Sequence, residues 1–589
     1  MRKSSHANEG MISRVFKSMF AVQLMTMLTG IIGSVIDGMI TGKFLGQNAM
    51  AAFGFTSSIS LAVAIVGSII STGASVICGK CLGEGKLDDT KRSFSVCFSA
   101  ALIVSLVSAA LIVTLATPAA KLMGAQGELV VLTADYIRGY GLACPGIVLV
   151  ALLMPMMQMD GEMKRLLVAV VIMTGGNIAA NLLNVLVFHG GMFGMALATA
   201  ISYYLALLYL SPHFLKKQAV FSRPSLVLDA SIIRAMISSG FPTAASQLGR
   251  LLLTFFLNRY LMANWGGTAV AIHTVIMSVA NLCMVPGTAL SSSVQVISGI
   301  LYGEEDRTAL KQLMRAAMQY NVVVNGACTL LFLLLAEPLV NMFFNGNSAA
   351  IATTVAGFRM YTLCLLSFGT NLIFRSYCQA TAQVKKSYIL TVCDCFLAPF
   401  LASLLLGSLF EIPAVWLCYA LGEGLTTIVM LALFKCSNRG LSGFESLIPI
   451  PKSLGEDIEA ALEYTTSESS EEQAVALSTK VAAFCAQNGA SRRQRFLISL
   501  AVEEAVGNVM EHGFNDGKPH HIEMRILKKR DGWMLRIRDD CPQFDPGKYI
   551  EQFDNTDPAS NIGLKLIRGI TVEMVYMNAL KLNNLMIRI

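Results

Sequence analysis

Charged side chains are scarce in this chain: Asp, Glu, Lys and Arg make up 14% of its 589 residues, whereas 54% are hydrophobic. Soluble domains carry about a quarter of charged residues, so this scarcity excludes a single ordinary globular protein. The scarcity is uneven. Residues 1–455 hold 29 Lys+Arg and 18 Asp+Glu, whereas the much shorter stretch 456–589 holds 16 and 20. A long membrane part is therefore followed by a tail large enough for one small soluble domain.

Two further absences narrow the function. The 14 cysteines include no second pair with zinc-site spacing beside Cys78 and Cys81, so neither a zinc centre nor a disulfide scaffold is expected. No G-x-x-x-x-G-K-[ST] motif occurs, which excludes a P-loop ATPase that would power transport directly. The excess of basic residues lies in short loops between apolar runs, so it indicates membrane topology and not nucleic-acid binding.

Twelve apolar runs are long enough to cross a bilayer, which needs about 20 apolar residues. They lie at 18–41, 49–78, 93–116, 139–159, 166–188, 192–211, 235–262, 269–298, 316–336, 351–380, 387–408 and 413–434. Loops on the side of the N-terminus carry 19 Lys+Arg, and the opposite loops carry three. The positive-inside rule predicts a multi-pass protein of the plasma (cytoplasmic) membrane with both termini in the cytoplasm.

An internal repeat relates the two halves of the membrane part. Residues 46–84 match residues 266–304 at 11 of 39 positions with an offset of 220, and the shared positions include Gly46/Gly266 and Gly83/Gly303. Copies that lie six helices apart share one orientation, which predicts two parallel six-helix repeats around a central cleft, an architecture suited to alternating access. The expected units are an N-terminal segment (1–17), a first bundle (18–211), a connection (212–234), a second bundle (235–437), a linker (438–455) and a tail domain (456–589).

Acidic residues inside the predicted spans are candidate ion sites, because a charge at a helix centre costs about 2.5–3.5 kcal/mol. Asp37 lies near the outer end of the first span, Asp394 lies in the eleventh and Glu423 in the twelfth. An acid that alternates between dry and wet surroundings can couple transport to H⁺ or Na⁺. The alternative is a structural ion pair with an intramembrane arginine. The candidates for that partner are Arg250, Arg259 and Arg375.

Several stretches of the membrane part resemble one transporter family. They are residues 36–46 (IDGMITGKFLG), 49–54 (AMAAFG), 184–188 (NVLVF) and 194–202 (GMALATAIS), together with 240–242 (GFP) at the start of the second copy. Over about residues 10–437 the chain resembles the multidrug and toxic compound extrusion (MATE) transporters. The resemblance implies cation-coupled export of small organic, often cationic, substrates across the lipid bilayer. In some members an Asp on the first helix carries the coupling ion, and Asp37 matches that position.

The tail is predicted to be an α/β sandwich. A strand-like start at 458–464 precedes helices at about 470–488 and 492–512, strands at 521–528 and 533–538, a third helix near Asn561 and two closing strands. Glu504 and Asn508 are four residues apart and share one helical face. Together with Asp539 at a strand end and Gly563 at a helix start, they form a set suited to hydrated Mg²⁺ and nucleotide phosphates.

This set resembles the GHKL-type (Bergerat-like) ATP-binding fold, most closely the anti-sigma-factor serine kinases, over about residues 456–589. The resemblance implies Mg–ATP as a cofactor, with Glu504 as the general base and Asn508 as the Mg²⁺ ligand. It further implies that Asp539 reads the adenine and that Gly563 belongs to the phosphate loop. The implied partner is a sigma factor or a small antagonist protein.

The tail departs from the family pattern where D-x-G-x-G reads Asp539-x-Cys541-x-Gln543. Side chains in place of the glycines are expected to crowd the nucleotide, which leaves open a degenerate domain kept only for protein contact. For the whole chain, we expect a cation-driven antiporter with a regulatory tail on a flexible linker, whose removal leaves efflux largely intact. The alternatives are a membrane-tethered sensor or serine kinase, a scaffold for a sigma-factor regulator, and a flippase for lipid-linked precursors with a cationic cleft.

Overall fold

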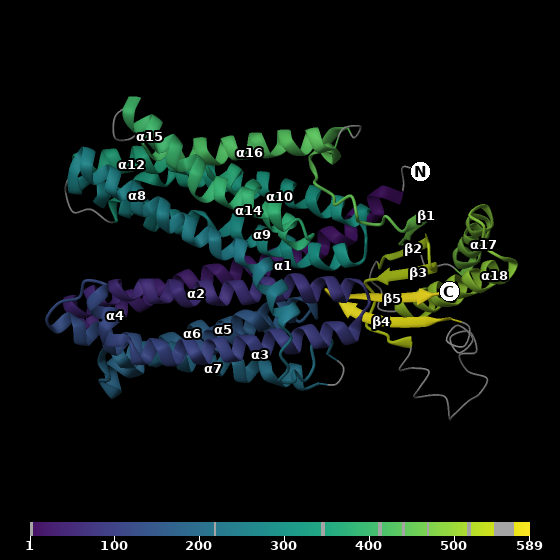
Figure 1. The fold of residues 1–589 in the computed structure, drawn as a ribbon, viewed down its shortest axis with the longest axis horizontal. Helices are drawn as coiled ribbons and strands as arrows, with labels where there is room; N and C mark the ends of the chain where they lie inside the picture. The colour runs from purple at the N-terminus through teal and green to yellow at the C-terminus, as the bar shows by residue number, and fades with distance from the viewer. Residues whose placement is uncertain are drawn as a thin grey trace.

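The computed structural model describes residues 4–216, 219–342, 348–409, 415–438, 442–467, 471–514, 520–546 and 571–589. Helices occupy the described chain as far as Ser437, and a five-stranded sheet with two covering helices forms the C-terminal part (Figure 1). The chain is therefore a helical membrane half followed by an α/β tail, which confirms the predicted fold class.

The first bundle contains seven α-helices, of which α4 is a short connector. They are α1 (Ser4–Ile40), α2 (Gly46–Gly83), α3 (Leu87–Thr114), α4 (Ala116–Leu122), α5 (Glu128–Met159), α6 (Met163–Leu183) and α7 (Gly191–Leu215). Two short π-helices interrupt the regular winding. One, η1 (Thr41–Leu45), joins α1 to α2, and the other, η2 (Asn184–Phe188), continues α6.

The second bundle is more interrupted. It contains α8 (Ala230–Cys283), α9 (Val285–Gly303), α10 (Arg307–Leu334), α11 (Ala336–Asn341), α12 (Ser348–Thr362), α13 (Leu365–Ala380), α14 (Val384–Val392), η3 (Cys393–Leu397), α15 (Ala398–Leu409) and α16 (Leu417–Ser437). Helix α8 turns sharply at Gly266, and α12 and α13 form one span bent by 40°. The described residues hold ten candidate spans when α12 and α13 count as one, and these become the predicted twelve when Gly10–Gly83 and α8, which each turn at a glycine, count as two.

The backbone repeats the symmetry that the sequence predicts. Gly46 has φ 86° and ψ −178°, and Gly266, its counterpart at an offset of 220, has φ 76° and ψ −171°. These left-handed angles favour glycine, because a Cβ would clash with the backbone. Both glycines therefore make the same sharp turn at the end of the membrane half that lies away from the tail.

A second symmetric feature lies at the opposite end, where α2 crosses α9. A methyl group on Gly83 would overlap the carbonyl oxygen of Ile300, and one on Gly303 would overlap that of Lys80, again positions 220 apart. The two bundles touch backbone to backbone at this end, which we call the tail-side gate, and diverge away from it (Figure 1). The membrane half therefore has its tail-side gate closed.

The tail is a two-layer sandwich. Its antiparallel sheet has the order β1-β2-β3-β5-β4, with β1 (Ile458–Thr466), β2 (Ile522–Lys529), β3 (Gly532–Asp539), β4 (Glu573–Ala579) and β5 (Leu582–Arg588). Helices α17 (Glu471–Gln487) and α18 (Arg492–Gly513) cover one face over an apolar core that includes Val481, Val502 and Ile537. The other face of the sheet turns toward the ends of the bundles (Figure 1). The predicted third helix lies outside the described residues.

The linker is not the flexible coil that its glycines and prolines predict. Residues Gly443–Leu447 form a 3₁₀ helix. Lys311 of α10 pairs with Glu445 at 2.6 Å, and Arg307 donates from Nε to the carbonyl oxygen of Leu454 at 2.9 Å. Contacts with the membrane half therefore fix the path of the described linker, a tertiary effect that local composition does not encode.

Candidate ion site and nucleotide pocket

Asp37 lies half-buried in the first bundle, near the end of α1. Its Oδ1 accepts a hydrogen bond of 2.7 Å from Nδ2 of Asn181 on α6. When the Asn177 amide is turned so that its nitrogen faces Asp37, that nitrogen lies 2.6 Å from the same oxygen while its oxygen accepts from Thr199. A carboxylate held by two neutral amides keeps its charge available, because no cation neutralises it in these contacts. This arrangement suits the reversible binding of a small cation.

Each π-helix adjoins a polar residue inside the membrane half. Helix η1 begins four residues after Asp37, η2 begins at Asn184, three residues after Asn181, and η3 contains Asp394. A π-bulge is rare and occurs frequently at functional sites, because the inserted residue re-aims its neighbours. The distortions therefore coincide with the predicted ion-site residues Asp37 and Asp394, and with Asn181, which sequence reasoning missed.

The two acids of the second bundle have different surroundings. Arg375 donates from Nη1 to Asp394 at 3.3 Å, and both side chains are buried. Glu423 accepts 2.7 Å from Nδ2 of Asn371, whose oxygen accepts from Thr427. Asp394 thus occupies the structural ion pair that was the alternative to a coupling site, whereas Glu423 has an amide partner as Asp37 does.

Two of the three candidate arginines, Arg250 and Arg375, lie near the same acids, Asp394 and Glu423, and the third lies elsewhere. Arg375 pairs with Asp394, Arg250 lies over the ring of Phe368 at 5.0 Å, and Arg259 is exposed on α8. The strongly cationic cleft that a flippase for lipid-linked precursors would need is therefore not assembled by these three residues.

In the tail, Asp539 and Asn508 line one cavity of about 220 Å³ between α18 and the sheet. Apolar side chains form most of its walls, among them Val509, Ile537 and Leu585. Asp539 Oδ1 accepts from the backbone N–H of Cys541 at 3.0 Å and from Nδ2 of Asn583 at 2.7 Å. An apolar slot with a fixed carboxylate at its end fits a flat base that donates an N–H, as adenine does.

Burial raises the pKa of Asp539, and the hydrogen bond from Asn583 opposes that rise. Glu504 lies one turn before Asn508 on α18, outside the described lining of the cavity. Gly563, the predicted phosphate-loop glycine, lies outside the described residues. Cys541 and Gln543, which replace the motif glycines, both line the cavity.

Two polar lining residues, Tyr576 and Asn583, were missed by the sequence-based prediction. Tyr576 on β4 donates to Asn583 Oδ1 at 2.7 Å, and Asn583 on β5 in turn holds Asp539. The available signal was the polar pair Asn583-Asn584 inside an otherwise apolar closing strand. Because successive side chains of a strand point to opposite faces, such a pair places one amide on each side of the sheet.

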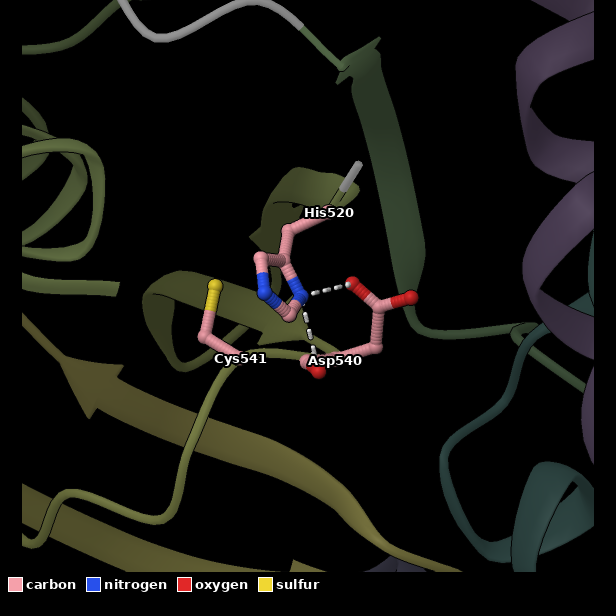
Figure 2. Close-up of side chains that lie close together, drawn as sticks. All are labelled: His520, Asp540 and Cys541. Atoms are coloured by element: carbon pink, nitrogen blue, oxygen red, sulfur yellow. Dashed lines mark hydrogen bonds and ion pairs between the residues drawn. The ribbon is translucent and has the colours of Figure 1, made fainter. Parts of the chain in front are cut away.

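A cluster of metal-ligand types lies at the rim of this cavity. One ligand atom each of His520, Asp540 and Cys541 lie within 4.8 Å of one another, with the His520 ring between the other two (Figure 2). Arg14 of α1 pairs with Asp540 at 2.9 Å, and the backbone N–H of His521 donates to it at 2.7 Å. A guanidinium beside the carboxylate opposes cation binding, so we interpret this cluster as the anchor of α1 on the tail.

Comparison with known proteins supports the division of the chain into a two-bundle transporter and an ATP-binding domain. Residues 23–183 and 242–405, more than half of the chain, match the MatE family, and residues 467–589 match the histidine kinase-like ATPase domain. The chain belongs to the MatE family, whose members are the MATE transporters, and carries a C-terminal histidine kinase-like ATPase domain.

Similar curated proteins match 61–72% of this chain. The multidrug export protein MepA of Staphylococcus saprophyticus is 23% identical over 399 residues, which are 64% of this chain and 85% of that protein. The probable multidrug resistance protein YoeA of Bacillus subtilis is 21% identical over 377 residues, which are 61% and 80% of the two chains.

Solved structures show the same fold at low identity. The outward-facing conformation of a multidrug resistance MATE family transporter aligns with a TM-score of 0.65 and 20% identity over 72% of this chain and 96% of that one. A crystal structure of MATE in complex with MaD3S aligns with a TM-score of 0.67 and 19% identity over the same shares. The two-bundle fold of the membrane half is thereby established.

Proposed function

We propose that the protein is an antiporter that exports organic, drug-like cations in exchange for H⁺ or Na⁺, and that its nucleotide-binding tail regulates it from the cytoplasm. The amide-held carboxylate of Asp37, at a π-helical distortion of the first bundle, carries this proposal. MATE membership and relatives named as multidrug export proteins support the substrate class. The loop charges support a plasma-membrane orientation with both termini in the cytoplasm, so that the closed tail-side gate is the cytoplasmic one.

Asn181 gives a direct test of the ion site. Asn181→Ala removes the amide that donates to Asp37 Oδ1. A hydrogen bond to a charged group contributes about 1.5–3 kcal/mol, so the cation concentration for half-maximal transport is expected to shift by at least about tenfold. The measurement is substrate efflux from vesicles against graded H⁺ or Na⁺. Asn321→Ala, a buried asparagine of the second bundle, is the control and should leave that concentration unchanged.

The tail is proposed to bind Mg–ATP, with Asp539 accepting from the adenine amino group and Asn508 as the Mg²⁺ ligand at the rim. Glu504 would serve as the general base if the domain transfers phosphate. Cys541 and Gln543, which stand where the family motif has glycines, line the cavity. Their side chains narrow the site, which supports slow or purely regulatory nucleotide binding over a fast kinase.

Asp539→Asn is expected to weaken ATP binding to the full-length protein about tenfold or more, because the charged acceptor for the base is lost. Asp531→Asn, an exposed acid in the turn between β2 and β3, is the matched control. Calorimetry with Mg–ATP measures both. Equal affinity in the two variants would show that Asp539 does not read the base and would favour the contact-only domain.

A sigma factor or a small antagonist protein remains the partner that the kinase resemblance predicts. Such a partner would need an open surface of the tail. The face of the sheet opposite α17 and α18 is already covered by the membrane half, so binding there would require the tail to leave the gate.

A further inference from the structure

Three arginines project from the covered face of the sheet into the tail-side gate. Arg538 pairs with Glu304, and Asn584 donates to the other oxygen of Glu304 at 2.6 Å. Arg536 donates to the carbonyl oxygen of Gly83 at 3.0 Å, and Arg525 lies 3.5 Å from Asp306. Because Gly83 ends α2 and Glu304 follows α9, the tail holds both bundles at once. We call these contacts the gate clamp.

The gate clamp is buried and charged. The side chains of Arg538 and Glu304 are each 3% exposed, and that of Asp306 is fully buried. Burial lowers the pKa of Arg536 and of Arg538 to about 10, so both guanidinium groups stay charged at neutral pH. Removing one partner of a buried ion pair is costly, because the other charge stays buried with one counter-charge fewer. A substitution that neutralises Glu304 should therefore weaken docking of the tail, since Arg536 and Arg538 both face this carboxylate.

The gate clamp contacts only one of two glutamates that the internal repeat relates. Glu84 is the repeat counterpart of Glu304, yet it pairs with Lys86 of its own loop at 2.8 Å and with Lys80 in the last turn of α2 at 3.7 Å. The tail therefore contacts one copy of the repeated glutamate through a salt bridge and the other bundle through a backbone carbonyl. The two equivalent positions provide a matched pair for experiment.

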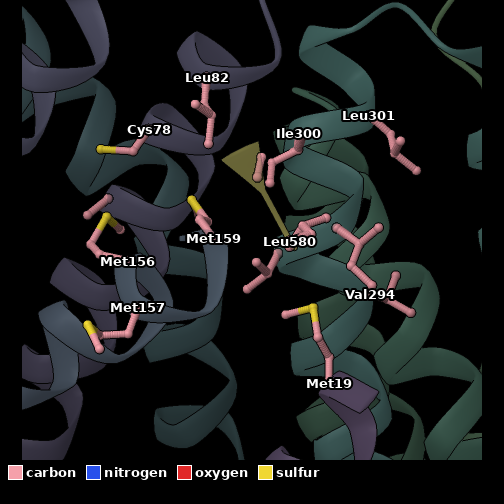
Figure 3. Packing of buried hydrophobic residues seen from close by; sticks show 14 of the residues in the cluster. Met19, Cys78, Leu82, Met156, Met157, Met159, Val294, Ile300, Leu301 and Leu580 are labelled. Atoms are coloured by element: carbon pink, nitrogen blue, oxygen red, sulfur yellow. The ribbon is translucent and has the colours of Figure 1, made fainter. Parts of the chain in front are cut away.

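The tail makes a second contact with the gate at the tip of the hairpin between β4 and β5. Leu580 sits between α2 and α5 of the first bundle and α9 of the second, in the same apolar cluster as Met159 and Ile300 (Figure 3). Its backbone N–H donates to the carbonyl oxygen of Met159 at 2.7 Å. Leu580 and Lys581 have φ of 58° and 63°, values that hairpin turns satisfy best with Asn or Gly. Contact with the gate, and not turn propensity, accounts for leucine at this position.

The strands of the clamp also build the nucleotide pocket. Arg538 pairs with Asn584 across β3 and β5, and the next pair in the register is Asp539 with Asn583. The first pair faces Glu304, and the second lines the cavity on the opposite face. A shift of these two strands on nucleotide binding would therefore reach the gate with no intermediate element.

We propose that the tail is an intramolecular inhibitor that recognises the closed tail-side gate, holds the bundles together through the gate clamp and Leu580, and is coupled to nucleotide through β3 and β5. The inference rests on the proposed alternating-access function, in which the gate must open for each cycle. An opened gate moves Gly83 away from Glu304, so the tail cannot bridge them and must release one bundle first.

Two substitutions weaken the inhibitor without removing a catalytic or ion-site group. Glu304→Gln removes the charge that faces Arg536 and Arg538. Leu580→Asn removes the apolar wedge and places a turn-favouring residue at the hairpin tip, so the tail should stay folded. Glu84→Gln is the control at the repeat counterpart.

Hydrogen exchange of the full-length protein in lipid nanodiscs measures opening of the tail-side gate independently of transport. Opening on the tail side closes the opposite end, so exchange around Gly46 and Gly266, far from the tail, should slow in Glu304→Gln and Leu580→Asn and not in Glu84→Gln. Gradient-driven turnover should rise severalfold in the same two variants. If folded Glu304→Gln and Leu580→Asn exchange hydrogen around Gly46 and Gly266 at the wild-type rate, the tail is not an inhibitor of gate opening. This outcome would overturn the inference whether or not the protein exports drugs.

The coupling to nucleotide has its own readout. Coupling between two sites is reciprocal. If Mg–ATP changes how tightly the tail docks on the gate, then docking changes the affinity of the tail for Mg–ATP by the same factor. Weakening the gate clamp should therefore change that affinity. Titration of wild type, Glu304→Gln and Glu84→Gln with a fluorescent ATP analogue measures it. A shift in Glu304→Gln alone supports the coupled strands, and identical affinities in all three proteins would overturn the nucleotide part of the proposal.

Discussion

Asp37→Asn is expected to reduce gradient-driven export to the level of vesicles without protein. The substitution keeps the size and the hydrogen bond to Asn181 but removes the charge that would bind and release the cation. The ion gradient supplies about 2.3 kcal/mol per charge per 100 mV of membrane potential. Without the carboxylate, no group at this site binds the ion, so that energy cannot drive export. Substrate binding should persist, because the fold and the cleft are retained.

The measurement compares efflux per folded transporter for Asp37→Asn and Asp135→Asn under one gradient. Asp135 pairs with Arg138 on the exposed surface of α5, so its loss should leave transport unchanged. Wild-type efflux in Asp37→Asn would show that Asp37 is structural and would direct attention to Glu423, the other acid with an amide partner.

The second large effect is expected at the α2–α9 crossing. In Gly303→Ala and Gly83→Ala, the new methyl group overlaps a backbone carbonyl of the opposite bundle, which no side-chain rotation relieves. Overpacking of this kind costs about 1–3 kcal/mol, so the equilibrium between the closed and the open tail-side gate should shift about 5- to 150-fold toward open. Loss of the gate clamp leaves this crossing able to close, whereas the added methyl group obstructs the closed crossing itself. Export should therefore fall in Gly303→Ala and Gly83→Ala, because the transporter seldom returns to the outward-open state.

Gly326→Ala on α10 is the matched control, since nothing lies within 4 Å of the added methyl group. Alanine is favoured over glycine inside a helix by about 0.5–1 kcal/mol, so a loss in Gly303→Ala cannot arise from helix propensity. Hydrogen exchange of the α2 and α9 ends, combined with efflux, checks both points. Unchanged exchange in Gly303→Ala would contradict the closed crossing.

The sequence predicted the membrane half well because its signals are long and local. Apolar length gave the spans, and the glycines at an offset of 220 gave the repeat that Gly46 and Gly266 confirm in their backbone angles. It did not predict the three π-helices of the described residues. Those depend on packing between helices, which a periodic pattern does not specify.

The tail shows the opposite balance. Its strands and its two described helices were predicted from the sequence pattern, whereas one shared site for Asn508 and Asp539 was implied by the resemblance to the GHKL-type fold. Arg536 and Arg538 alternate with Leu535 and Ile537 along β3. Such alternation is typical of a sheet that has one face in water. Only the tertiary structure shows that this face is buried against Glu304, because the partner is 232 or more residues away in the chain.

Purified full-length protein in sealed vesicles tests the central claim, that a cation gradient drives export while nucleotide only regulates it. A fluorescent organic cation should be transported under an imposed H⁺ or Na⁺ gradient without ATP, faster in Glu304→Gln than in wild type. An ionophore that dissipates the gradient should abolish transport in both. Transport that persists without any gradient when Mg–ATP is supplied, or that fails in both proteins under every gradient, would contradict the account.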